Sequence, residues 1–477
     1  FEKAPQRWDN LARMHQLYLA GHLIQGAVAH HRATGKTTLL DVATRFADLI
    51  CATFTPASPG TDGHEEIELA LAELYRHTGE RRHLDQALFF LDLRGRTPPV
   101  LDGSEYLQDH LPVRAQREIV GHAVRATYLA IGMADTYAET GDPGLWSAVR
   151  ALWDSAFERK AYVTGGLGAR RQGEAFGDDY ELPNDTAYAE TCAAIGGFLW
   201  NWRMLHLDPD TTSRARYADW MEIALYNGIL SGLSLDGTHY FYPNPLANDG
   251  SHRRTEWFST ACCPPNVARL LLSLPGYIAG LSDDAFWLHH FLPGDLRIAR
   301  GEREVHARIE TDYPWGERVR LEITRLSRPS VRAALNVRIP HWCEGATLHV
   351  NGAPAHVAAP AGRYASLARE WRQGDVFELH LPLTPRRIHS PPQVAANAGR
   401  VALARGPLVY CAEGVDNPGV DLASAPVPAT AALSARPQTL LGLGPIVTLQ
   451  AGDLTAIPYH LWAHRAPGPM HVWLRES

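Results

Sequence analysis

Two adjacent cysteines are the clearest chemical feature of this sequence. Cys262 and Cys263 are followed by Pro264, Pro265 and an apolar helical pattern. Because proline is favoured in a first helical turn, we expect both cysteines at a helix N-terminus, where backbone N–H groups and the helix dipole stabilise thiolates. Two neighbouring thiolates repel one another unless a cation joins them, and zinc suits such ligands best. The pair therefore predicts a zinc site.

A disulfide between these two neighbours is the alternative interpretation. Their Cα atoms lie about 3.8 Å apart across a trans peptide, which is shorter than the usual disulfide range of roughly 4.4–6.8 Å. The chain has only 6 cysteines in 477 residues, too few for a disulfide-stabilised scaffold. We therefore predict reduced thiols and a reducing, cytoplasmic compartment.

A four-coordinate zinc ion needs two further ligands. Cys192 is the other cysteine of the first 280 residues with polar neighbours, and Glu190 precedes it by two positions. Residues two apart on a regular helix point about 200° away from each other. A shared metal thus requires non-helical backbone from Ala189 to Thr191 and a helix that begins near Cys192. The predicted zinc site then consists of Glu190, Cys192, Cys262 and Cys263.

An acidic segment, RRQGEAFGDDYELPND, lies just upstream of these ligands. Glu174, between glycine and alanine, is the least crowded of its carboxylates and is the best candidate to face a cavity. Asp178, Asp179 and Glu181 are equally compatible with a solvated loop. A carboxylate and a nucleophile across a pocket with histidine and aromatic walls is the arrangement of a glycoside hydrolase.

A loose internal repeat organises the first 280 residues. Each copy consists of Gly-His, an apolar helix, a Thr-Gly turn and a second amphipathic helix. Three copies begin at Gly21, Gly63 and Gly121, and their turns contain Gly35, Gly79 and Gly141, where glycine suits a helix C-terminus. Weaker copies follow. Helical hairpins of this kind favour a ring in which inner helices line a cavity, an (α/α)6-type barrel.

The repeat carries one histidine per copy at the same position. If the inner helices start at one mouth of the ring, then His22, His64 and His122 share a pocket with Glu190 and the cysteines. The alternative is that each Gly-His pair merely caps its own helix and each imidazole is satisfied locally. Three instances favour the shared pocket.

Alternating apolar and polar residues replace the helical pattern after about Trp287. The predicted fold is a multidomain α+β chain: a helical barrel over residues 1–285, then antiparallel β-sandwich domains over 286–390 and 391–477. Cys343 and Cys411 stand alone in strand patterns and are expected to be buried packing residues.

Composition excludes several classes of partner. The net charge is −7 at pH 7 and no basic run is present, which argues against nucleic acid and anionic membranes. No apolar stretch approaches about 18 residues, so no membrane span is expected. The oligomeric state is left open, and a homodimer is compatible with the sequence. Because the chain opens on Phe1, its true N-terminus and any upstream signal are expected to lie outside it.

Four motifs carry a resemblance to a known family. They are GEAFGDDYELPNDTAYAETCAAIGGFLWNWRM, YNGILSGLSLDGTHYFYPNPL, ACCPPNVARLL and GHAVRATYL. Together they closely resemble the β-L-arabinofuranosidases of glycoside hydrolase family 127, from about residue 11 to at least residue 290. The strand-rich remainder fits that family's trailing β-sandwiches less distinctively. Relative to the family, the chain is expected to lack an N-terminal segment that helps to close the barrel.

The resemblance implies a retaining exo-hydrolase that acts on β-L-arabinofuranosides in small oligosaccharides or glycosides, with zinc bound by one glutamate and three cysteines. It implies that Cys262 is the nucleophile and Glu174 the acid/base, expected about 5–5.5 Å apart in a retaining enzyme. The residues that it implies in sugar binding are His22, His64, His122, Tyr242 and Trp257.

Three alternatives remain at this point. Similar barrels serve unsaturated-uronate hydrolases and sugar epimerases, but those enzymes work without a thiolate, so the three cysteines argue against them. The same barrel and mechanism could act on another or a modified furanoside. The metal could also be purely structural, in a carbohydrate-binding protein without catalysis.

Overall fold

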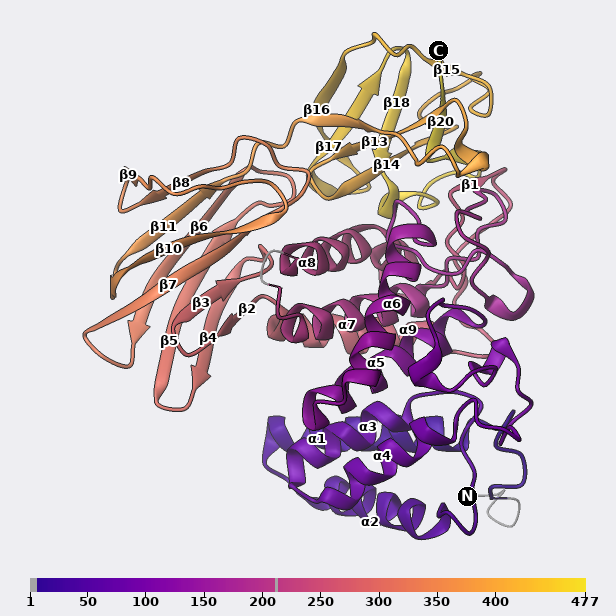
Figure 1. The fold of residues 1–477 in the computed structure, drawn as a ribbon. Coiled ribbons are helices and arrows are strands. Elements are labelled where there is room, and N and C mark those ends of the chain that lie inside the picture. The colour runs from indigo at the N-terminus through magenta and orange to yellow at the C-terminus, as the bar shows by residue number, and fades with distance from the viewer. Residues whose placement is uncertain (1–6, 211–212) are drawn as a thin grey trace. The chain divides into compact units, whose positions relative to one another are not determined.

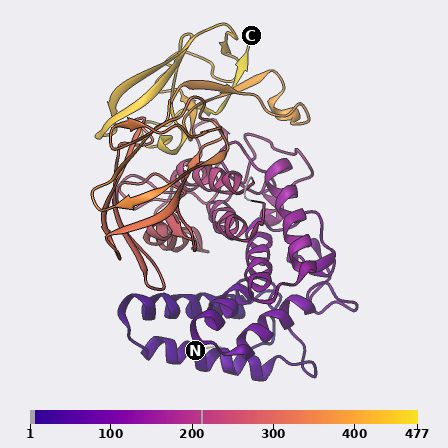
Figure 2. The same ribbon diagram turned by 60° about the vertical axis from the view of Figure 1, so that its left-hand side comes forward.

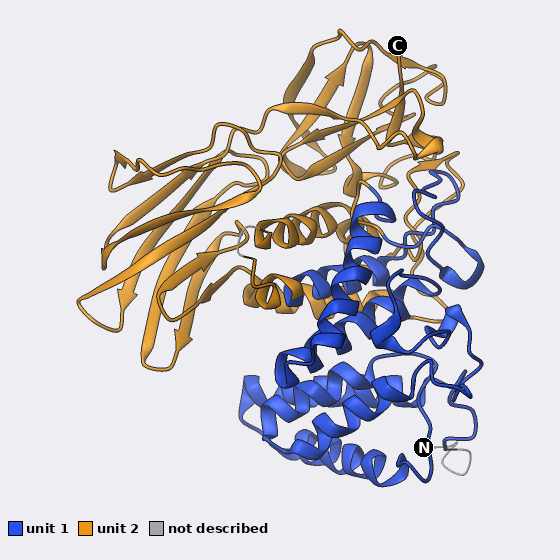
Figure 3. Cartoon of the chain, viewed as in Figure 1, with its two compact units in different colours: residues 1–162, 167–203 blue, residues 163–166, 204–477 orange. Residues whose placement is uncertain are grey.

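The computed structural model describes residues 7–210 and 213–477. The chain divides into two compact units (Figure 3). The first comprises residues 1–162 and 167–203, and the second comprises residues 163–166 and 204–477. Helices come first and strands follow, as Figure 1 shows along the colour bar. The chain is therefore a mixed helix-and-sheet protein with a helical N-terminal region, as predicted.

The first unit is built from helical hairpins, which Figures 1 and 2 show as paired indigo and violet helices. Within each hairpin the second helix packs against the first, and α3 also packs against both α1 and α5. The first helices thus form an inner row, and α5 is buried along nearly its whole length. The hairpins are α1 (Gln16–Thr34) with α2 (Thr38–Thr53), α3 (Ile67–Thr78) with α4 (Arg81–Leu93), and α5 (Ala123–Thr140) with α6 (Pro143–Arg159).

The Thr-Gly turns end the inner helices as predicted. Gly35, Gly79 and Gly141 have φ values of 69°, 77° and 69°, in the left-handed region that glycine adopts without strain. Each donates its backbone N–H to the carbonyl four residues earlier, at 2.8 Å in all three cases. The repeat in the sequence is therefore a repeat of helix C-caps.

The Gly-His pairs do not share one register, and the prediction that each begins a helix is wrong for the first copy. His22 lies well inside α1, whereas His64 precedes α3 and His122 is the N-cap residue of α5. Helix α1 begins before its Gly-His pair because a residue distant in the sequence caps its N-terminus. The Asp62 carboxylate accepts the N–H groups of Leu17 and Tyr18 at 2.6 and 3.0 Å, which satisfies the first turn of α1.

Three more helices follow. They are α7 (Thr191–Leu207), α8 (Arg214–Ile223), which continues into a π-helical turn at Ala224–Ile229, and α9 (Cys263–Ser273). No helix in the described parts of the chain is long and apolar enough to cross a membrane.

Two facing sheets form a sandwich in the second unit. One has the strand order β10-β7-β3-β2 and the other β4-β5-β6-β11-β8-β9, and every pairing is antiparallel except β3 with β7. The strands are β2 (Ala279–Leu281), β3 (Ala285–Leu288), β4 (Gly294–Arg300), β5 (Arg303–Thr311), β6 (Arg318–Leu326), β7 (Ser330–Ile339), β8 (Thr347–Val350), β9 (Ala353–Pro354), β10 (Arg363–Arg372) and β11 (Val376–His380).

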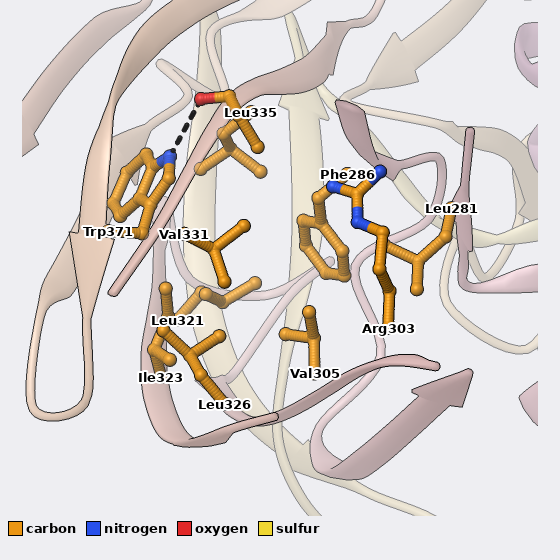
Figure 4. A pocket seen from close by; sticks show the side chains of 11 residues that line it. Leu281, Phe286, Arg303, Val305, Leu321, Ile323, Leu326, Val331, Leu335 and Trp371 are labelled. Atoms are coloured by element: carbon orange, nitrogen blue, oxygen red, sulfur yellow. Dashed lines mark hydrogen bonds between the residues drawn. The ribbon is translucent and has the colours of Figure 1, made fainter. Parts of the chain in front are cut away.

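The core of this sandwich is apolar. Figure 4 shows side chains from both sheets around a pocket at one end, where the Trp371 indole N–H donates to the carbonyl oxygen of Ala333 at 3.2 Å. Arg303 is the only charged residue in the lining of that pocket. Cys343 is fully buried in the same core, and Cys411 is fully buried in the later strand β14 (Leu408–Glu413), as predicted for packing residues.

The last strands form one ten-stranded network with the main order β15-β20-β13-β14-β18-β17-β16. Its members are β1 (Ala247–Asn248), β12 (Pro385–Ile388), β13 (Arg400–Arg405), β14 (Leu408–Glu413), β15 (Pro426–Val427), β16 (Leu433–Leu440), β17 (Leu443–Ala451), β18 (Leu454–Pro458), β19 (Met470–His471) and β20 (Trp473–Glu476). The pairing of β1 with β19 ties the segment before α9 to the C-terminal sheet. The exact domain boundaries proposed from sequence stay a prediction.

A buried ionic cluster joins α8 to the sandwich inside the second unit. The fully buried guanidinium of Arg338 contacts Asp219 Oδ1 and Glu222 Oε1, each at 2.6 Å. The Tyr313 hydroxyl donates to Glu222 at 2.8 Å, and burial raises the pKa of that phenol well above its ordinary value. Because both carboxylates are buried, their charges depend on this one arginine.

We expect Arg338→Met to destabilise the protein by about 3–5 kcal/mol, since it leaves two buried carboxylates without their cation. Urea unfolding followed by circular dichroism measures this. The matched control is Arg318→Met, which removes an exposed arginine that pairs with Glu378 on the same sandwich and should change stability little. An equal loss of stability in both variants would contradict the idea that the buried arginine matters more than the exposed one.

Candidate active site

The three predicted pocket histidines belong to one aromatic cluster in the first unit. The ring centroids of His64 and His122 are 5.9 Å apart. Tyr18 links the third member, because its ring lies 4.4 Å from that of His22 and 4.3 Å from that of His64. The Tyr128 ring is 5.9 Å from His64 and 6.4 Å from His22. The three histidines therefore lie in one cluster, although their helix registers differ, and their role in a shared sugar pocket stays a prediction.

Sequence reasoning missed the tyrosines of this cluster. Tyr18 lies one helical turn before His22 on α1, so its i, i+4 spacing to the histidine was an available signal. Tyr106 had no such signal. Its ring lies 5.7 Å from that of His122, and the Arg125 guanidinium stacks on it at 4.5 Å.

His64 is a neutral hydrogen-bonding group. Its Nδ1 lies 2.8 Å from the carbonyl oxygen of Glu65, which can only accept, so Nδ1 carries the proton and Nε2 is left as an acceptor. Burial, reinforced by the nearby guanidinium of Arg125, holds the pKa of His64 well below its ordinary value.

His122 has the opposite tautomer. As the N-cap of α5, its Nδ1 accepts the backbone N–H of Arg125 at 3.5 Å. The proton is therefore on Nε2, which lies 3.0 Å from Oε2 of Glu174. A helix terminus thus fixes the imidazole that holds the candidate catalytic carboxylate.

Glu174 stands on a constrained loop. Its own φ is 50° and that of Gly173 is 71°, so two consecutive residues occupy the left-handed region. Ala175 forms isolated β-bridges to both Arg170 and His122, which hold the loop against the start of α5. Left-handed backbone at a non-glycine residue costs free energy and persists only where its surroundings impose it. The loop therefore presents the Glu174 carboxylate in one place.

The other acidic residues of this loop are paired on its surface. Arg170 contacts both Asp178 and Glu181, and Arg159 lies 2.7 Å from Asp179. These three carboxylates follow the solvated-loop interpretation, and Glu174 alone of the four joins the histidine cluster.

The backbone breaks where the Glu-x-Cys pair requires it. Ala189 has a φ of 39°, and its N–H donates to the carbonyl of Gly168 at 2.7 Å. Helix α7 begins at Thr191, one residue earlier than expected. Glu190 and Cys192 are both buried, each 1% exposed. His122, Glu174 and Glu190 offer ligand atoms that all lie within 4.8 Å of one another, so the two carboxylates are near neighbours.

The vicinal cysteines begin α9 in the second unit, as predicted. Cys262 is the N-cap residue, Cys263 is the first helical residue, and the prolines fill the first turn. The two residues form no disulfide, and their sulfur atoms lie 3.7 Å apart. Two sulfurs bound to one zinc ion at about 2.3 Å in a tetrahedron lie about 3.8 Å apart. The pair therefore has the spacing of two zinc ligands.

The four predicted ligands form a group that could hold a metal ion. One ligand atom from each lies within 4.8 Å of those of the other three, and only Cys262 is partly exposed. Three thiols and one carboxylate are the donors of a zinc site. The group comprises Glu190, Cys192, Cys262 and Cys263.

The two aromatic residues expected to contact sugar lie in the second unit. The Tyr242 ring packs edge-on against Phe258, with centroids 5.4 Å apart. Trp257 is 62% exposed, so its indole is free to meet a ligand but is not held in place by packing.

Comparison with known proteins decides the family. Residues 1–276 match the model described as β-L-arabinofuranosidase, GH127 catalytic domain. Residues 285–383 match the GH127 middle domain and residues 385–475 the GH127 C-terminal domain. The chain belongs to glycoside hydrolase family 127.

Individual relatives agree with this membership. A non-reducing end β-L-arabinofuranosidase from Bifidobacterium longum subsp. longum is 35% identical over 537 aligned residues, which cover 98% of this chain and 80% of the relative. The crystal structure of a GH127 β-L-arabinofuranosidase from Geobacillus stearothermophilus T6 matches with a TM-score of 0.92 and 40% identity, over 100% of this chain and 82% of that one. A second GH127 β-arabinofuranosidase matches with a TM-score of 0.91 and 39% identity, over 100% and 79%. The chain is therefore a glycoside hydrolase.

We expect the contribution of His64 to the stability of this glycoside hydrolase to fall as the pH drops below about 6.5, because unfolded His64 binds a proton that folded His64 does not. In that window one such group contributes up to about 1.4 kcal/mol per pH unit. His64→Gln removes this contribution, so the stability of the variant relative to wild type should rise between pH 7 and pH 5. Urea unfolding at several pH values measures it, and a difference independent of pH would contradict the buried neutral state.

Proposed function

We propose that this protein is a retaining exo-hydrolase that releases L-arabinose from the non-reducing end of β-L-arabinofuranosides. The observation that supports it most is the match over 98% of the chain to a relative named for that activity. The local chemistry agrees, since Glu174 and Glu190 lie together beside a cluster of histidines and tyrosines suited to bind hydroxyl groups.

The proposed scaffold is an (α/α)6-type barrel. Support comes from the inner row of α1, α3 and α5, with α2, α4 and α6 as the second helices of their hairpins. The histidine cluster lies near the N-terminal ends of α3 and α5, where a barrel of this kind would open.

The proposed metal is zinc, held by Glu190 and the three cysteines of the group described above. The sulfur spacing of Cys262 and Cys263 and the sulfur-rich donor set fit that ion. When bound, zinc would supply positive charge that keeps the thiols ionised at neutral pH. The nucleophile and the proton donor of the proposed reaction are side chains of this chain.

In the first step, Cys262 Sγ attacks the anomeric carbon and the bond from that carbon to the leaving oxygen breaks. Glu174 gives its proton to that oxygen, so the alcohol leaves neutral. In the second step, the Glu174 carboxylate takes a proton from water, whose oxygen attacks the same carbon. The carbon–sulfur bond breaks, and Cys262 returns as a thiolate. Two displacements retain the anomeric configuration.

The sugar is held by the aromatic cluster. In this proposal His22 and His64 hydrogen-bond furanose hydroxyls, with the His64 Nε2 as an acceptor, and His122 lines the same site while its ring nitrogens contact Arg125 and Glu174. Tyr242 and Trp257 complete the proposed sugar contacts. The exposed indole of Trp257 suits the outer part of the substrate rather than the reacting ring.

We expect Glu174→Gln to lower kcat by about 10²–10⁴-fold on alkyl or oligosaccharide β-L-arabinofuranosides, because an amide cannot donate the proton that the leaving oxygen needs. The effect on the first step should be smaller with an activated aryl leaving group. Steady-state kinetics on both substrate types measures this.

The matched control for that variant is Glu181→Gln, a carboxylate of the same loop that pairs with Arg170 on the surface. It should keep nearly full kcat. Equal losses from both variants would show that the loop, and not the Glu174 proton, is what matters.

We expect Cys262→Ser to abolish turnover far more than it weakens sugar binding, because a serine hydroxyl is a poor nucleophile at neutral pH. Cys51→Ser is the control, since Cys51 is a free thiol on α2 outside the site. Kinetics and isothermal titration with L-arabinose separate turnover from binding. Full activity of the Cys262 variant would exclude the covalent mechanism and favour a protein whose metal is structural.

Metal removal tests the ion itself. Treatment with a strong chelator should remove about one zinc per chain, measured by atomic emission, and should abolish hydrolysis of an aryl β-L-arabinofuranoside until zinc is returned. Hydrolysis that survives complete removal of zinc would contradict the proposed site.

A further inference from the structure

His22 makes an ion-pair contact that the mechanism above does not use. Its Nδ1 lies 3.1 Å from Oε1 of Glu66. The Glu66 side chain is fully buried, while the His22 ring remains 31% exposed. Glu66 is the residue just before α3, so the contact joins the middle of one inner helix to the start of the next.

Gly21 makes room for this contact. A Cβ atom on Gly21 would lie 2.6 Å from Cγ of Glu66 and 3.1 Å from its backbone carbonyl carbon, so any side chain there would push Glu66 away. The glycine of the second Gly-His pair has another neighbour, because a Cβ on Gly63 would lie 2.2 Å from the carbonyl oxygen of Ala12. The absence of a side chain at Gly21 therefore allows the Glu66 carboxyl group to approach the helix that carries His22.

The contact favours one position for the proton of His22. At 3.1 Å an unprotonated Nδ1 would set its lone pair against an oxygen of the Glu66 carboxyl group, so a proton on Nδ1 is favoured. Nδ1 faces this fully buried side chain, while 31% of the His22 side chain remains exposed.

We propose that Glu66 is a positioning residue that holds His22 in the Nδ1–H tautomer, so that Nε2 accepts a hydrogen bond from a hydroxyl of the sugar. This inference rests on the proposed function, in which His22 binds the furanose. It gives the three histidines distinct roles: His22 and His64 present Nε2 acceptors, and His122 presents an Nε2–H donor to Glu174. A carboxylate that orients a functional histidine through its second nitrogen is a common device of enzymes and metal sites.

The first test reads the tautomer without any substrate. In ¹⁵N-histidine-labelled wild-type protein at pH 8, His22, assigned by its absence in His22→Gln, should show a protonated Nδ1 and an unprotonated Nε2. Glu66→Leu should lose this pattern, and Gly21→Ala should weaken it although both partners are still present. A wild-type His22 protonated on Nε2 alone would overturn the proposal.

The second test asks whether Glu66 acts through His22. Glu66→Leu and Gly21→Ala should each raise KM for an aryl β-L-arabinofuranoside about tenfold, with a smaller change in kcat. In a His22→Gln background the same changes should raise KM little further, because their shared target is already lost. Glu73→Gln, which alters a partly buried carboxylate on the same helix α3 that contacts Arg32 and not His22, is the matched control and should leave KM unchanged.

The outcomes separate this proposal from the function on which it rests. Equal effects of Glu66→Leu in both backgrounds would mean that Glu66 merely supports the fold, and would overturn the positioning role. Should the wild-type protein hydrolyse no β-L-arabinofuranoside, the proposed function fails while the NMR result still decides the tautomer. If Glu66→Leu does not fold, Gly21→Ala carries both tests, since it keeps the side chains of both His22 and Glu66.

Discussion

The contact between His122 and Glu174 is the interaction on which the rest of the site depends. It joins the N-terminus of α5 to a loop whose backbone occupies a costly left-handed conformation, and β-bridges from Ala175 hold the two together. The same carboxyl group is 32% exposed and offers an oxygen within 4.8 Å of one from the buried Glu190. Two neighbouring carboxyl groups disfavour a second negative charge, so the pair favours a proton on one of them, which the proposed acid role of Glu174 requires.

Several buried ionisable side chains in this protein contact polar or oppositely charged groups that are distant in the sequence. The Asp62 carboxyl group accepts two backbone N–H groups from the first turn of α1. The Arg338 guanidinium, in the sandwich, pairs with two carboxylates of α8. Arg94, itself fully buried, lies 3.0 Å from Glu65 and 3.6 Å from Glu68, the second residue of α3. These contacts are strong constraints because removal of the arginine leaves buried carboxyl groups without a positive partner. The contacts of Asp62 and Arg94 lie beside the helices that carry the histidines.

The three Gly-His pairs show how one sequence pattern can arise for different physical reasons. Gly21 admits a buried carboxylate, Gly63 lies against a backbone carbonyl, and Gly121 adopts a left-handed φ of 72° beside the carbonyl of Glu105. Each of the three glycines lies against another segment of the chain, and each neighbouring imidazole belongs to the same cluster. The repeat therefore predicted the correct neighbours, and its reading as three equivalent helix starts was wrong because Asp62 extends α1 beyond its Gly-His pair.

The sequence by itself determined the features that depend on neighbouring residues. The C-cap glycines, the proline-marked start of α9, the break before Cys192 and the change from helices to strands all follow from local conformational preference. The family motifs also identified Glu174 and the cysteines before any fold was known. Tertiary structure alone decided the positions of Tyr18 and Tyr106, the tautomers of the histidines and the partnership of His22 with Glu66. These depend on groups far apart in the sequence, such as His22 and Glu66 or His122 and Glu174, whose approach is set by packing and by the cost of buried charge, and no local pattern records it.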